Sequence, residues 1–178
     1  MLQPVATVRP KSDEYFEYYD TYISKVPDGD VLELLKSQVP ELNEFFVSVP
    51  ESESTRLHAP YTWTIKQVVG HLIDAERIFA DRLHRFAMGD PQPQPGMDQD
   101  IYVAGGNYDS VALSDLVEEF CLCRRANCLL IARLPDQAWD HRGVASGYEV
   151  TVRALAWMMA GHVIHHMRIV RMRLGSHA

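Results

Sequence analysis

Residues 152–174 read VRALAWMMAGHVIHHMRIVRMRL, and this stretch decides the fold. Leu155, Met159, His162, His166 and Ile169 follow one another at spacings of four and three, which is the period of one face of an α-helix. The two histidines therefore stand where Leu or Ile normally packs in the seam of a helix bundle. The stretch predicts a bundle helix with two imidazoles on its buried face.

The two histidines and a third one elsewhere form a candidate metal site. His162 and His166 are four residues apart, so both imidazoles can reach one ion. His71 lies at a similar depth in another apolar helical stretch. Neutral imidazole is the commonest protein ligand for metals, and three protein nitrogens with further positions open are typical of catalytic sites. We expect His71, His162 and His166 to bind one divalent ion.

Two alternatives stay open from the residues alone. A single histidine on an apolar face is more often a hydrogen-bonded core residue than a ligand. A buried pair of histidines favours the ligand interpretation. Each imidazole loses its hydration and needs a polar partner, and one shared metal ion is a partner for both. His165 could replace His166 in an i, i+3 pair with His162, and we rank it as a flanking residue.

Periodicity and capping signals predict three further long helices. The first covers about residues 29–47, where Pro40 should kink or split it. The second runs from a capping box at Thr64 to about residue 88. The third extends from a cap at Ser114 to about residue 133.

The fourth helix begins at a Thr151 cap and stops at Gly175. Residues 89–109 are rich in Pro and Gly, which predicts an irregular crossover between the second and third helices. Ser146-Gly147 predicts a small hairpin before the fourth helix. Residues 1–27 are an aromatic-rich extension that should pack on the bundle as a short helix. The expected fold is all-α, a four-helix bundle with a long crossover.

Composition is that of one globular domain covering residues 1–178. The chain has 178 residues, 47% of them hydrophobic and 23% charged, and a net charge of -7. Such an acidic balance argues against a nucleic-acid partner. The sequence shows no signal peptide and no apolar run long enough to span a membrane, so we expect no membrane partner and a cytoplasmic location. The chain has three cysteines, Cys121, Cys123 and Cys128, all on one predicted helix. Their odd number and their position favour reduced thiols over disulfides.

Two runs resemble the histidine-bearing helices of the DinB/YfiT-like metalloenzyme family. They are WTIKQVVGHLIDAERIF at 63–79 and VTVRALAWMMAGHVIHHMRIV at 150–170. The resemblance covers nearly the whole chain, including the helix order and the crossover. It implies a four-helix bundle that holds a divalent metal, commonly zinc or nickel, through His71, His162 and His166. It also implies a homodimer.

The same resemblance implies several functions. Some members are transferases or isomerases that use a low-molecular-weight thiol such as bacillithiol, mycothiol or glutathione. Others are metal-dependent hydrolases. We expect a small-molecule thiol transferase first, with a hydrolase as the alternative. A metal-binding protein without turnover is the third interpretation, because fold alone does not define a reaction.

Polar residues near the predicted ligands are candidates for further roles. Asp74, three residues after His71, could be a general base or could orient a ligand. Glu76 is expected to pair with an arginine at the surface. Arg124 and Asn127 could bind an anion if they face inward. Three residues of the crossover could close one end of the bundle: Asp98, Asp100 and Tyr102.

Overall fold

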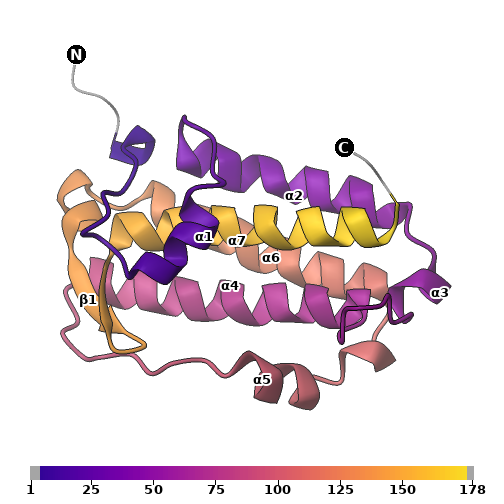
Figure 1. Cartoon of the computed structure of the whole chain (residues 1–178). Helices are drawn as coiled ribbons and strands as arrows, with labels where there is room; N and C mark the ends of the chain where they lie inside the picture. Colours follow the sequence, from indigo (N-terminus) through magenta and orange to yellow (C-terminus); the bar gives the residue numbers. More distant parts are fainter. Residues whose placement is uncertain (1–4, 176–178) are drawn as a thin grey trace.

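Four long helices lie side by side and form a bundle in the computed structural model, which describes residues 5–175 (Figure 1). They are α2 (Val31–Val47), α4 (Ile65–Ala87), α6 (Leu113–Ala132) and α7 (Val152–Arg173). Short elements connect them: α3 (Glu51–Ser54), α5 (Gln99–Gly105) and the 3-10 turns Tyr108–Ser110 and Asp136–Asp140. The predicted four-helix bundle with a long crossover is confirmed. No described helix is long and apolar enough to cross a membrane.

Side-chain caps set the start of three of the long helices. Thr64 accepts a hydrogen bond from the Gln67 backbone N–H, and the Gln67 side chain accepts one from the Thr64 N–H, which completes the predicted capping box of α4. The Thr151 hydroxyl accepts from the Ala154 N–H at the start of α7. Asp30 caps α2 in the same way. These caps satisfy amides that have no partner inside the helix.

The predicted cap of α6 is wrong, and so is one of the two outcomes predicted for Pro40. Pro40 was expected to kink or split α2, and it does not split the helix, which continues through it to Val47. The buried face of α2 supplies the reason, since it packs against α6 and α7 on both sides of the proline. Ser114 does not cap α6: the helix begins at Leu113, whose amide N–H donates to the carboxylate of Glu51 instead.

The crossover between α4 and α6 is more ordered than its composition predicts. It contains α5, which lies along the outside of α4 (Figure 1). Asp98 caps α5 by accepting from the amides of Asp100 and Ile101. Gln94 exchanges backbone hydrogen bonds with Val144 and Ser146. The crossover is thereby attached both to the bundle and to the hairpin.

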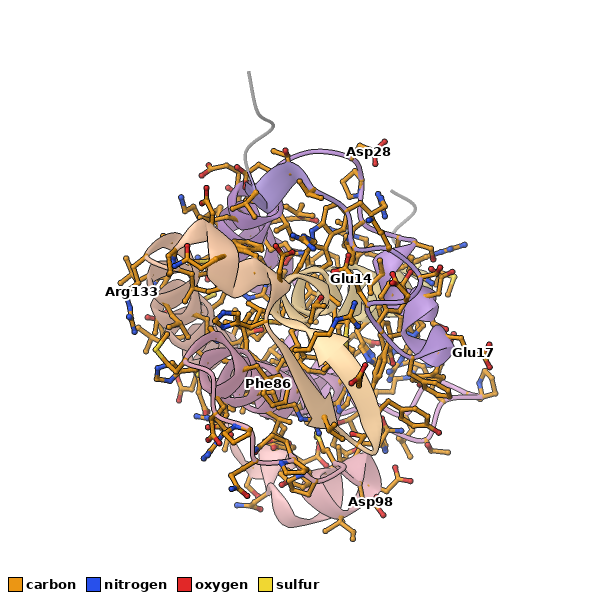
Figure 2. The ribbon with its side chains drawn as sticks, turned by 90° about the vertical axis from the view of Figure 1, so that its left-hand side faces the viewer. Glu14, Glu17, Asp28, Phe86, Asp98 and Arg133 are labelled. Carbon is orange, nitrogen blue, oxygen red and sulfur yellow. The ribbon has the colours of Figure 1, made fainter. Side chains whose placement is uncertain are left out.

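The predicted hairpin is confirmed and covers one end of the bundle (Figure 2). Strands β1 (Arg142–Ala145) and β2 (Tyr148–Thr151) are antiparallel. Ser146 and Gly147 have φ of 55° and 85°, as a two-residue turn that follows the strand twist requires. Phe86 of α4 lies behind this sheet (Figure 2).

The N-terminal segment packs across α7 as three short helical pieces. They are Val5–Thr7, Glu17–Tyr19 and α1 (Asp20–Ile23). A Cβ atom on Gly161 would lie 2.2 Å from the Tyr22 carbonyl oxygen, so α1 needs a glycine there to come this close. Gly161 directly precedes His162. The aromatic extension is therefore docked beside one of the predicted ligands.

Glu14 fixes the same segment to the start of α7, and it lies beside the hairpin in Figure 2. Its carboxylate accepts hydrogen bonds from the Thr151 hydroxyl at 2.8 Å and from the Arg153 guanidinium at 3.0 Å. Arg153 also pairs with Asp140. These buried contacts hold the N-terminal segment, the hairpin and α7 together.

A buried ion pair joins all four long helices. Arg124 of α6 makes two hydrogen bonds to the Glu76 carboxylate of α4, at 2.8 and 2.7 Å. It also donates to Gln38 of α2 and to the carbonyl of Met159 of α7. Asn127 donates to Glu76 as well. The prediction that Glu76 pairs at the surface is wrong, and the anion held by Arg124 and Asn127 is Glu76 itself.

Candidate metal centre

Three histidines converge between α4 and α7. Nε2 of His162 lies 3.1 Å from Nε2 of His71 and 3.1 Å from Nε2 of His166. The ligand atoms of all three lie within 4.8 Å of one another. Among residues 5–175, no further His, Cys, Asp or Glu joins this group. His165 stands at its flank, with its ring against those of His166 and Tyr22.

Burial keeps these imidazoles neutral at pH 7. Desolvation, with a smaller contribution from His165, lowers the pKa of His71 to about 4. Desolvation and the neighbouring His71 lower the pKa of His166 to about 3. Burial and its histidine neighbours also lower the pKa of His162 well below the ordinary value. Neutral imidazole is the form that binds a metal.

The contacts at His162 fit a shared ion better than hydrogen bonding among the rings. Nε2 of a neutral imidazole either donates one proton or accepts through one lone pair. Nε2 of His162 faces Nε2 of both His71 and His166, so a hydrogen bond to one of them leaves the close approach to the other unexplained. Tetrahedral ligand nitrogens ~2.05 Å from zinc lie ~3.3 Å apart. The two observed 3.1 Å separations are close to that value, and the ligand atoms of the third pair, His71 and His166, lie within 4.8 Å of each other.

Aromatic rings enclose the histidine cluster. Trp63 lies beside His71, and Phe79 and Tyr22 present their edges or faces to His162, with ring centroids 5.1–5.6 Å apart. Such rings exclude water and hold the imidazoles in place. Tyr22 comes from α1, so the N-terminal segment supplies part of the wall.

Two pockets reach the cluster, and Gln99 lines both of them. The tyrosine pocket has a volume of about 150 Å³ and includes His71 and His162 in its wall. Its other lining residues are Tyr18, Tyr19, Tyr22, Ala75, Ile78, Phe79, Arg82, Met97, Gln99 and Ser146. The tryptophan pocket, of about 350 Å³, includes His166. It is otherwise lined by Pro60, Tyr61, Thr62, Trp63, Val68, Gln99, Asp100, Ile169 and Arg173.

Asp74 is not brought to the histidine cluster. Its carboxylate accepts a hydrogen bond from the Tyr108 hydroxyl at 2.5 Å, and it lines neither pocket. Nδ1 of His71 is buried and has no hydrogen-bond partner among the described residues, so Asp74 does not orient that ring. Burial raises the pKa of Asp74.

Of the three crossover residues singled out, only Asp100 lines a pocket at the cluster. Asp98 is the cap of α5, and Tyr102 is exposed. Three further residues at the cluster were not predicted from the sequence: Arg82, Gln99 and Tyr22. A signal for Arg82 was present: His71, Ala75, Ile78 and Arg82 are spaced as one helix face, and all four line the tyrosine pocket.

The three cysteines lie on α6, away from the pockets at the cluster. Desolvation raises the pKa of Cys121, Cys123 and Cys128, so they are protonated thiols at neutral pH and poor nucleophiles. Among the described residues, all three are free. They are packing residues of this helix.

Replacing all three cysteines by serine should therefore leave the chemistry intact. We expect unchanged metal content and unchanged turnover, with a modest loss of stability because two of the thiols are buried. Metal analysis and a steady-state assay on the folded variant check this. Full metal content with all turnover lost would place the nucleophile on the protein.

Comparison with known proteins places this arrangement in a family. A family model described as the DinB superfamily matches residues 34–170. YfiT from Bacillus subtilis, described as a probable metal-dependent hydrolase with an unusual four-helix bundle topology, is 18% identical with a TM-score of 0.66. The match covers 97% of this chain and 96% of YfiT.

A second solved structure of the same fold is the mycothiol-dependent maleylpyruvate isomerase. It is 16% identical with a TM-score of 0.66, over 82% of this chain. The chain spans 61% of that isomerase. No curated protein is detectably similar in sequence. With a family model matched over most of its length and the bundle topology of YfiT, this chain belongs to the DinB superfamily.

Proposed function

We propose that His71, His162 and His166 hold one divalent metal ion through their Nε2 atoms, and that the protein is an enzyme acting on a small molecule beside it. The observation that carries this proposal is the pair of 3.1 Å Nε2 separations among neutral imidazoles, of which His71 and His162 are buried and His166 is partly buried. Three nitrogen donors suit zinc or nickel better than magnesium or calcium, which prefer oxygen. Zinc or nickel is the proposed metal.

Open space at the cluster favours an enzyme over a structural site. A structural zinc site is closed by four protein ligands, whereas a catalytic site keeps a position for substrate. The described residues supply three, and two pockets reach them. A bound divalent ion supplies Lewis acidity, which lowers the pKa of a thiol or water and polarises a substrate group.

Thiol transfer is the reaction class that the surrounding residues support best. Water attack usually recruits a carboxylate as general base. Asp74 is hydrogen-bonded to Tyr108 and lines neither pocket, and the one described carboxylate in a pocket wall at the cluster is the exposed Asp100 of the crossover. The protein thiols are protonated, so the nucleophile is proposed to be a low-molecular-weight thiol of the bacillithiol, mycothiol or glutathione kind. The aromatic walls and the polar ends of the pockets would position this thiol and its acceptor.

Hydrolysis is the second candidate. It is favoured by the likeness to YfiT, described as a probable metal-dependent hydrolase, which covers almost the whole of both chains. In this case the base would be Asp100, which lines the tryptophan pocket with His166, or Asp74 after release from Tyr108. The expected homodimer and cytoplasmic location stay predictions.

A substrate panel with metal-loaded protein separates these candidates. We expect transfer of bacillithiol, mycothiol or glutathione to an electrophile to be faster than ester or amide hydrolysis. The control is a preparation stripped with a chelator and then reloaded. Hydrolysis that disappears in Asp74→Asn, with none of the three thiols turned over, would favour the hydrolase. Neither activity at full metal occupancy would favour a protein that binds metal without turnover.

A further inference from the structure

Arg82 is a buried cation that pairs with no carboxylate of residues 5–175. Four cationic side chains are buried in the described part of the chain, and three of them form ion pairs: Lys66 with Glu51, Arg124 with Glu76, and Arg153 with Glu14. Arg82, only 4% exposed, forms none with any described carboxylate. The adjacent Asp81 pairs with Arg85 instead. A buried charge normally has a charged or metal partner.

Neutral groups hold the Arg82 side chain in place. One terminal nitrogen donates to the Pro95 carbonyl at 2.6 Å and to the Ser146 hydroxyl at 3.2 Å. The Tyr19 hydroxyl also interacts with the guanidinium. Desolvation lowers the pKa of Arg82, which means that burial disfavours its charge. A bound anion would offset that cost.

The position of Arg82 connects this charge with the histidine cluster. Arg82 lies on the same face of α4 as His71, three turns along the helix, and both line the tyrosine pocket. The pocket volume of about 150 Å³ corresponds to about five water molecules at ~30 Å³ each. Such a space accommodates a short carboxylic acid. A guanidinium forms charge-assisted hydrogen bonds to a carboxylate, and Nε and Nη1 of Arg82 remain for them beside the two Nη2 contacts to Pro95 and Ser146.

We propose that Arg82 binds the carboxylate of the small-molecule substrate or thiol, with the reacting end of that molecule at the histidine cluster. The position of the reacting end at the histidine cluster rests on the proposed function. The substrate class that Arg82 indicates is a short-chain carboxylic acid, either free or carrying a thiol. Arg82 is then a binding residue for specificity. Its contacts with Pro95 and Ser146 aim the guanidinium into the tyrosine pocket.

Paired probes that differ only in charge test the proposal. The dissociation constants of 3-mercaptopropionate and 3-mercaptopropionamide are measured by calorimetry on metal-loaded protein. Wild type should prefer the acid by about 10- to 100-fold, as expected for hydrogen bonds to a charged group. Arg82→Gln should lose this preference, and Arg82→Lys should keep part of it because the charge remains without the planar fork. The control Arg85→Gln, at an exposed arginine of the same helix, should keep the full preference.

A second pair of probes separates this inference from the metal proposal. Propionate and propionamide carry no thiol, and they are titrated into chelator-treated protein by ligand-observed NMR. Preference for propionate that depends on Arg82 supports the anion site even if the histidines bind no metal. Equal binding of acid and amide by wild type would overturn the proposal. So would an unchanged preference in Arg82→Gln accompanied by a lower melting temperature, because Arg82 would then only connect the crossover to the hairpin.

Discussion

Replacement of His162 by alanine should abolish stoichiometric metal binding while the bundle stays folded. Nε2 of His162 is the atom that faces both other imidazoles, at 3.1 Å each. Outer partners of metal ligands already contribute 10- to 100-fold to affinity, so loss of a ligand should cost more than about 100-fold. Most of the core is ordinary apolar packing, and helix content should persist. Elemental analysis and far-UV circular dichroism measure the two effects.

A matched control uses a histidine outside the cluster. His84 lies on α4, the helix of His71, and is exposed. His84→Ala should bind metal like the wild type. Added metal should raise the melting temperature of the wild type and of His84→Ala, because a ligand that binds only the folded state stabilises it. It should leave that of His162→Ala unchanged. Full metal content in His162→Ala would contradict the assignment.

Removal of Glu76 should be the most destabilising single change in the bundle. Glu76→Ala leaves the guanidinium of Arg124, 0% exposed, without its anion in the core. Breaking a buried pair from one side costs about 3–5 kcal/mol. The Arg124 network also reaches the carbonyls of Met159 and, through Gln38, of Ala160, just before His162. Urea unfolding of metal-free protein measures the free-energy change.

An exposed ion pair between the same two helices is the control. Arg77 of α4 and Glu119 of α6 pair at 2.6 Å with both side chains about half exposed. Glu119→Ala should cost about 0–1 kcal/mol, as exposed ion pairs do. The double variant Glu76→Leu with Arg124→Met should recover much of the stability lost in Glu76→Ala, because it leaves no unpaired buried charge. Equal costs for Glu76→Ala and Glu119→Ala would show that the buried pair is not central to the bundle.

Local signals in the sequence were sufficient to predict that the four long helices and the hairpin exist. The capping box at Thr64, the Thr151 cap and the Ser146-Gly147 turn each depend on a few neighbouring residues. The histidine cluster was also accessible, because its i, i+4 pair lies on one helix face and His71 lies on another apolar stretch. The geometry brings His166, rather than His165, together with the other two.

Long-range pairing was not accessible in the same way. Arg124 and Glu76 are 48 positions apart, and no local pattern distinguishes a buried pair from two surface charges. Pro40 does not split α2, because the packing of the apolar face of this helix outweighs one lost helix hydrogen bond. The start of α6 depends on Glu51, which is distant in sequence. Arg82 gave a local signal through its spacing from His71, but only the tertiary structure shows that it lacks an acidic partner.

The most direct measurement is anomalous diffraction from crystals of protein loaded with zinc or nickel, recorded at the absorption edge of that metal. The account predicts one peak between α4 and α7, with Nε2 of His71, His162 and His166 each about 2.0–2.2 Å away. It also predicts that no other protein atom among the described residues completes the coordination. A peak held by other residues, or imidazole nitrogens too far apart to share one ion in the loaded crystal, would contradict it.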